Sequence, residues 1–162
     1  MIRNHFAGFL LASVVAFPVM AQDAPTVKSI DVTVDIAAVQ NAAAAAYWGT
    51  LETDLEGAIL AKVQSQVADD GIDISIDLSE VELSNGFQEV VGLADTRLIG
   101  TVKMTHATDN SRFDTYELTV DVNAATPLLP EGFVLSTATV ETKEYYDAMI
   151  NAFANGVVER LK

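Results

Sequence analysis

Residues 47–78 read YWGTLETDLEGAILAKVQSQVADDGIDISIDL, and this stretch decides the fold. Apolar residues recur every three or four positions through its first part, which predicts one side of a long helix over Tyr47–Asp70. The members of this stripe are Trp48, Leu51, Leu55, Ile59, Val63 and Val67. We expect Gly71 to end the helix in the left-handed conformation.

After Gly71 the spacing changes to a strict alternation of apolar and polar residues, which is typical of a half-buried strand. The apolar positions are Ile72, Ile74, Ile76 and Leu78. A similar alternation predicts a first strand over Ile30–Ile36. Between the two lies the alanine-rich segment Ala37–Ala46, which either begins the long helix with Asn41 as a cap or forms a loop before it.

A β-hairpin is predicted over Arg97–Val122, because two alternating segments flank a run of turn formers at 107–112. Before the hairpin, a bulge near Ser79 or Glu80 would return later apolar residues to the core. The segment Ser84–Thr96 has no period, and we expect an apolar loop or a short helix there.

The last predicted element is a helix that Thr142 caps. Its apolar side consists of Tyr146, Met149, Ile150, Phe153, Val157 and Leu161. The preceding residues predict a loop over Asn123–Gly132 and a further short strand over Phe133–Val140. This order, β-α-β-β-β-(β)-α, predicts an α+β fold. We expect a two-layer sandwich in which two helices cover one face of a mainly antiparallel sheet of three to five strands.

The first residues are typical of a signal peptide. Arg3 precedes an apolar run over Phe6–Phe17, which is shorter than the roughly 20 residues that a membrane span requires. We therefore expect cleavage after Ala21, a single α+β domain over residues 22–162, and a periplasmic or secreted location. No second long apolar run predicts a membrane span after cleavage.

The composition excludes several kinds of partner and site. The chain has a formal net charge of −14, and removal of Arg3 with the signal peptide makes it −15, so nucleic acid and anionic membranes are poor partners. Cations and basic proteins are better ones. There is no cysteine, which excludes disulfides, thiolate nucleophiles and sulfur-ligated metals.

Catalytic motifs are also lacking. After signal removal His106 is the remaining histidine, which excludes a multi-histidine metal site, and its place near the hairpin tip indicates an ordinary polar residue. Phosphate-binding and dinucleotide-binding glycine patterns are missing, as is a nucleophile elbow. The sequence therefore predicts a protein that is not an enzyme and holds no cofactor.

Three sets of residues are candidate binding sites. The first is acidic: Asp31, Asp35, Asp73, Asp77, Glu117 and Asp121 recur on the wet side of predicted strands. They form either a solvated face or a site for a hard cation such as calcium. The second is aromatic and consists of Tyr47, Trp48, Tyr145 and Tyr146 at the two helix starts. These four form either a binding pocket or part of the core.

The third set, Phe87, Leu128 and Leu129, is apolar and falls in predicted loops. If exposed, it would be a contact surface for a partner protein; otherwise it caps the core. The leading hypothesis is a non-enzymatic envelope protein that binds a protein partner. The alternative is a periplasmic protein that binds a small ligand or a divalent cation.

Overall fold

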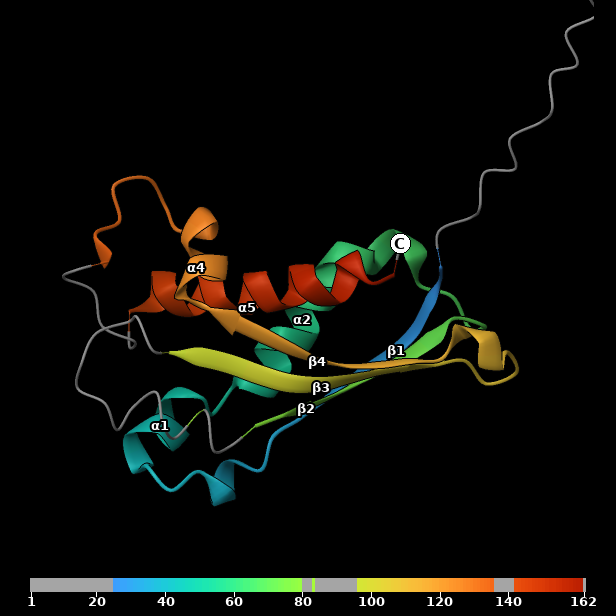
Figure 1. Cartoon of the computed structure of the whole chain (residues 1–162), viewed down its shortest axis with the longest axis horizontal. Helices are drawn as coiled ribbons and strands as arrows, with labels where there is room; N and C mark the ends of the chain where they lie inside the picture. The colour runs from blue at the N-terminus through green and yellow to red at the C-terminus, as the bar shows by residue number, and fades with distance from the viewer. Residues whose placement is uncertain (1–24, 80–82, 84–95, 136–141, 162) are drawn as a thin grey trace, which may run out of the picture.

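The computed structural model describes residues 25–79, 83, 96–135 and 142–161. It has a mixed α+β fold with an open four-stranded sheet in the order β1-β2-β3-β4 (Figure 1). The strands are β1 (Val27–Thr33), β2 (Ile72–Leu78), β3 (Arg97–Thr105) and β4 (Asp114–Asp121). β1 and β2 are parallel, whereas β3 and β4 are each antiparallel to the strand before them.

The helices are α1 (Ala42–Tyr47), α2 (Leu51–Val63), α4 (Val122–Ala125) and α5 (Lys143–Glu159). Short 3-10 turns lie at Ile36–Ala38, Gln64–Gln66, Asn110–Arg112 and Thr126–Leu128. None of the helices among the described residues combines the length and the hydrophobicity that a membrane span requires.

The predicted organising stretch forms the core of this fold. β1 and β2 are parallel because α2 carries the chain from one end of the sheet back to the other. Leu51, Leu55, Ile59 and Val63 of α2 are fully buried. The alternating isoleucines of β2 are also buried, as their spacing predicted.

The second long helix, α5, packs beside α2 and over β3 and β4 (Figure 1). Met149, Phe153 and Val157 of this helix are fully buried. The predicted hairpin is confirmed, and Leu98, Val102 and Met104 turn to the core as expected.

The predicted helix over Tyr47–Asp70 is wrong in its length. The chain leaves the helical path at Trp48–Thr50, so α1 and α2 are separate, and α2 ends at Val63. Gly49 is a poor helix former, which favours the break, and Thr50 stands at the N-cap of α2 without a side-chain capping bond. Asn41 caps α1, since its side chain accepts from the Ala43 and Ala44 N–H groups.

The end of the predicted helix also differs. Val67 is extended, 51% exposed and bridged to Val27, so it does not belong to the buried stripe. Gly71 does not take the left-handed conformation; among the described residues, only Gly132 has a positive φ. Gly71 is required for a different reason, because a Cβ there would lie 2.5 Å from the carbonyl carbon of Val27.

Three smaller predictions need correction. β1 ends at Thr33 rather than Ile36, because the Asp35 side chain accepts from the Ala37 N–H and starts a 3-10 turn. The predicted loop over Asn123–Gly132 contains most of α4, which Asp121 caps through the Ala124 N–H. Residues 133–135 form no strand, and the rest of Phe133–Val140 lies outside the described residues, as do Glu80 and residues 84–95.

Candidate functional site

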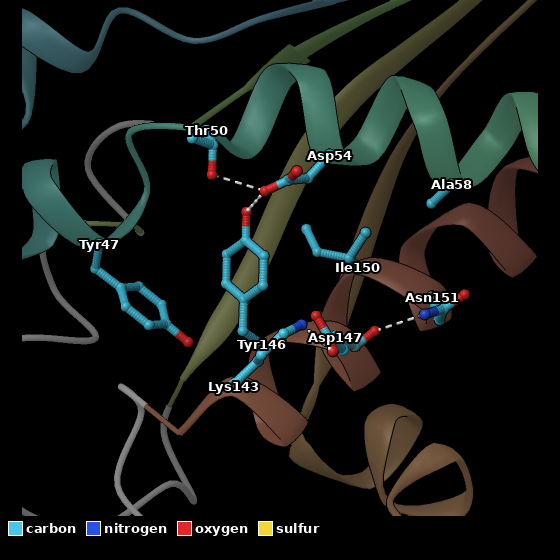
Figure 2. A pocket seen from close by; sticks show the side chains of 9 residues that line it. All are labelled: Tyr47, Thr50, Asp54, Ala58, Lys143, Tyr146, Asp147, Ile150 and Asn151. Carbon is cyan, nitrogen blue, oxygen red and sulfur yellow. Dashed lines mark hydrogen bonds and ion pairs between the residues drawn. The ribbon is translucent and has the colours of Figure 1, made fainter.

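An open cleft of about 500 Å³ lies where α1 ends and where α2 and α5 begin (Figure 2). We call it the helix-start cleft. Its lining residues are Tyr47, Thr50, Asp54, Ala58, Lys143, Tyr146, Asp147, Ile150 and Asn151. Most of them are polar, and they come from segments nearly a hundred residues apart in the sequence.

Each helix start supplies two adjacent aromatic residues with different roles. Trp48 and Tyr145 are buried in the core, at 2% and 1% exposure. Their neighbours Tyr47 and Tyr146 are half-buried and line the cleft. The four residues proposed from the sequence as either pocket or core are therefore divided between the two.

The aromatic rings pack edge to face. The Tyr47 and Tyr146 rings lie 5.3 Å apart at 87°, and the Tyr47 and Trp48 rings lie 4.6 Å apart at 78°. The Trp48 ring is also 5.6 Å from Tyr146. The buried Trp48 ring thus contacts both tyrosine rings that line the cleft, and this packing restricts their orientation.

Asp54 is the polar centre of the cleft. Its Oδ2 accepts hydrogen bonds from the Thr50 hydroxyl and the Tyr146 hydroxyl, each at 2.7 Å (Figure 2). The bond from Tyr146 joins α5 to α2. Burial raises the pKa of Tyr146, and the hydrogen bond to Asp54 and the nearby charges add to the shift, so this hydroxyl stays protonated at neutral pH.

The charges of the cleft are only partly compensated. Lys143 Nζ pairs with Asp147 Oδ2 at 2.6 Å, and this contact raises the pKa of the lysine. Asp54, in contrast, forms no ion pair within the described parts of the chain. Its carboxylate is held by two neutral hydroxyls and also lies within electrostatic range of the Lys143 ammonium. The cleft therefore sets two carboxylates, Asp54 and Asp147, against one ammonium and keeps a negative charge available to a ligand.

Such a carboxylate beside two aromatic rings is suited to a cationic group. An ammonium or guanidinium can donate charge-assisted hydrogen bonds to Asp54 and contact the faces or edges of the tyrosine rings. The sequence pattern did not single out Asp54, which is one of two acidic residues in the first turn of α2. The local signals in the sequence were Thr50, four residues before Asp54, and the two pairs of adjacent aromatic residues. The sequence did not show that these residues lie together in the folded protein.

The apolar residues proposed as partner contacts are only partly exposed. Leu128 is 41% exposed and lines a second cleft of about 370 Å³, which shares Asp147 and Asn151 with the helix-start cleft. Leu129 is partly buried and packs against the core. Phe87 lies outside the described residues.

The acidic residues do not gather as the cation hypothesis required. In the sheet register, each of these carboxylates on a strand has a non-acidic neighbour on the next strand. Asp31 lies beside Ser75, Asp77 lies between Thr33 and Thr101, and Asp121 lies beside Arg97. Glu117 faces Thr101, while Asp73 accepts from the Ser29 hydroxyl at 2.6 Å and pairs with Lys28 at 3.7 Å. Asp35 has left the sheet. The residues that the model describes contain no group of three or more acidic or histidine side chains that could hold a metal ion.

His106 lies away from the cleft and ties the hairpin to the turn before β2. Its Nδ1 accepts from the Thr108 N–H at 3.3 Å, so Nε2 carries the proton and donates to the Asp70 carbonyl at 2.6 Å. Both ring nitrogens are thus used, one within the hairpin and the other in the link to the turn before β2.

Comparisons with known proteins give no relative. No protein-family model, no curated protein and no solved structure matches the chain. The function is therefore inferred from the helix-start cleft and its charges.

Proposed function

We propose that this chain is an exported, non-enzymatic envelope protein that binds a basic protein partner, and that a lysine or arginine side chain of the partner enters the helix-start cleft. The observation that carries the proposal is the Asp54 carboxylate, held by Thr50 and Tyr146 beside two tyrosine rings and without an ion pair among the described residues. The net charge of −14 attracts the same class of partner over longer range.

The location follows from the N-terminal segment. Residues 1–21 have the features of a cleaved signal peptide, with cleavage after Ala21, which supports a periplasmic or secreted protein. We further infer that α2 and α5 cover one face of the sheet, so that the helices form one layer of a two-layer domain and the sheet forms the other. The hydroxyl-rich and acidic side chains of the strands then form the solvated outer face.

The binding free energy expected for a single cationic group in the cleft favours a protein partner over a free amine. A charge-assisted hydrogen bond contributes about 1.5–3 kcal/mol, and a cation–π contact contributes about 0.5–2 kcal/mol. Together they approach the roughly 4 kcal/mol of a millimolar complex. Additional buried surface is needed for tighter binding, and the neighbouring cleft at Leu128 would supply it.

A small ligand that carries an ammonium or guanidinium group is the second candidate. The volume of about 500 Å³ favours it, since ligand sites usually occupy roughly 300–1,000 Å³. Both candidates use Asp54 in the same way. They differ in whether a single cationic group is sufficient for micromolar binding.

The single tryptophan offers a direct test, because Trp48 touches both tyrosine rings of the cleft. We would titrate the purified protein with N-acetyl-arginine amide, and with the neutral N-acetyl-norleucine amide as a control, while following Trp48 fluorescence. The basic compound alone should change the emission, with millimolar affinity for a partner-binding cleft and micromolar affinity for a small-ligand site. No response at 50 mM, or an equal response to both compounds, would reject the cationic site.

Charge-matched variants identify the residue responsible. Asp54→Asn removes the charge in the cleft, whereas Asp77→Asn removes the same charge from the outer sheet face. We expect the first to weaken arginine-amide binding at least fivefold and to lose any partner recovered from envelope extract. The second should behave like the unaltered protein, and equal losses in both would indicate non-specific attraction instead.

A further inference from the structure

The outer edge of the sheet at β1 is covered by side chains of α2 at the end of the strand and just beyond it. The Val32 N–H donates to Glu56 Oε1 at 3.0 Å, and the Val34 N–H donates to Glu52 Oε1 at 2.8 Å. An edge strand otherwise presents unpaired backbone groups to other chains. The two glutamates therefore prevent a further strand from pairing at Val32 and beyond.

The same edge is open at Ile30. From Ile30 onward the backbone groups alternate in direction with a period of two, so the Ile30 N–H points the same way as those of Val32 and Val34. A register shift between Val27 and Ser29 interrupts this alternation before Ile30. No side chain of the described residues bonds to the Ile30 N–H. Here β1 faces a groove of about 330 Å³.

The groove is apolar and has room beside the strand. Gly57 forms its floor on α2, and a Cβ at this position would meet nothing within 4 Å. Leu60 and Val67 line it and are 48% and 51% exposed. An apolar side chain lying over Gly57 would cover both.

We propose that this groove binds an extended segment of a partner polypeptide, which pairs with the edge of β1 at Ile30 and places an apolar side chain over Gly57. This is strand addition, in which backbone hydrogen bonds supply affinity and a side-chain pocket supplies selectivity. The glutamates at one end and the Val27–Val67 bridge at the other limit the paired segment to a few residues.

The charge of the molecule selects the occupant. A second copy of this chain carries the same net charge of −14, which opposes a pairing between two β1 edges. Glu56 lines the groove, and the other charged lining residue, Lys28, is already paired with Asp73 at 3.7 Å. A segment that alternates basic and apolar residues is therefore favoured over self-association.

The groove is separate from the helix-start cleft, with which it shares no lining residue. A peptide of the form acetyl-Lys-Val-Lys-Leu-Lys-amide serves as the probe, and amide hydrogen exchange at Ile30 is the measurement. At saturating peptide we expect exchange at Ile30 to slow at least tenfold. The same peptide with every backbone amide N-methylated keeps its charges but cannot pair, and it should give no slowing.

Two substitutions at Gly57 make the test specific. Gly57→Leu fills the groove with a good helix former, so the fold is kept, and it should abolish the protection of Ile30. Gly57→Ala leaves most of the space and should retain it. Protection that survives Gly57→Leu, or no slowing at millimolar peptide, would overturn the proposal. Protection that instead rises with protein concentration in the absence of peptide would assign the edge to a second copy and would also overturn it.

The two binding proposals fail independently. Asp54→Asn should leave the peptide-dependent protection of Ile30 unchanged, whereas Gly57→Leu should leave the Trp48 response to arginine amide unchanged. If Asp54→Asn removed the protection, the peptide would be bound in the helix-start cleft, and strand addition at β1 would be rejected.

Discussion

Two glycines of this protein are used for opposite reasons. Gly71 lies where a Cβ would overlap the backbone of Val27 and Lys28, at 2.5 and 2.6 Å. Gly57 faces open space on α2, where glycine only weakens the helix. Close packing thus requires glycine at position 71, whereas position 57 has room for a larger side chain.

Alanine substitution separates the two roles. Gly71→Ala should lower the free energy of unfolding by about 1–3 kcal/mol, because the overlapping atoms are backbone and cannot rotate away. Gly57→Ala should raise it by about 1 kcal/mol through helix propensity. Urea unfolding followed by circular dichroism measures both, and shifts of the same sign would contradict this assignment.

The tyrosines predict an alkaline loss of stability. Burial raises the pKa of Tyr116 and of Tyr145 to about 12, against an ordinary value of 10.0. Because the folded state holds these protons more tightly, their contribution is complete below pH 10 and is lost as the pH rises from 10 towards 12. The denaturant midpoint of unfolding should fall across this pH window. Absorbance at 295 nm, which follows tyrosine ionisation, should show that these two tyrosines of the folded protein ionise above pH 10. Full tyrosine ionisation at pH 10.5 in the folded protein would disagree.

At the scale of elements, α2 performs three tasks with three sides. One side supplies the buried stripe from Leu51 to Val63, the second carries Asp54 into the helix-start cleft, and the third places Glu52 and Glu56 on the edge of β1. The break at Gly49 separates this helix from α1, and Trp48, in the turn between them, is buried while Tyr47 lines the cleft.

Removal of the edge cover should expose β1. The double substitution Glu52→Ala and Glu56→Ala leaves the Val32 and Val34 N–H groups without these acceptors, and we expect a loss of about 1–3 kcal/mol per uncovered buried group together with self-association. Sedimentation velocity detects the oligomers. The double substitution Glu117→Ala and Glu144→Ala removes equal charge elsewhere and should stay monodisperse under the same conditions.

At the scale of the whole molecule, the acidic charge is spread rather than concentrated. The strand carboxylates have hydroxyl side chains or a basic residue as neighbours on the next strand. Asp109 and Asp121 accept local hydrogen bonds, which lower their pKa values. Addition of millimolar calcium should therefore move the thermal midpoint no more than sodium chloride of equal ionic strength does. A calcium-specific rise would restore the cation hypothesis.

Export is the second prediction for the whole chain. When the full chain is expressed in a bacterial host with a secretion pathway, the protein recovered from the periplasm should begin at Gln22, which intact-mass spectrometry measures directly. Substitution of Ala21 by a bulky residue should leave the precursor uncleaved. Recovery of the full-length chain from the cytoplasm would contradict the predicted location.

Local spacing was enough to predict most of the elements. The alternation in 72–78 and in the hairpin depends only on the two-residue period of a strand, and most buried positions of α2 and α5 follow from the helical period. At the start of α5, however, Tyr145 is buried where the predicted stripe had Tyr146. The same spacing did not reveal the helix break, because Trp48 fits the stripe in a continuous helix as well as in the turn that the structure contains. It also could not show that Val67 leaves the stripe to pair with Val27.

The sequence by itself determined the mixed α+β class, the hairpin and the absence of cysteine chemistry, since these depend on residue types and short-range periods. Only the tertiary structure decided which residues meet in the two proposed sites. Tyr146 reaches Asp54 across 92 residues of sequence, and Glu56 reaches the Val32 N–H across 24. Such contacts depend on how the helices dock on the sheet, and docking is set by the packing of the whole core rather than by any one segment.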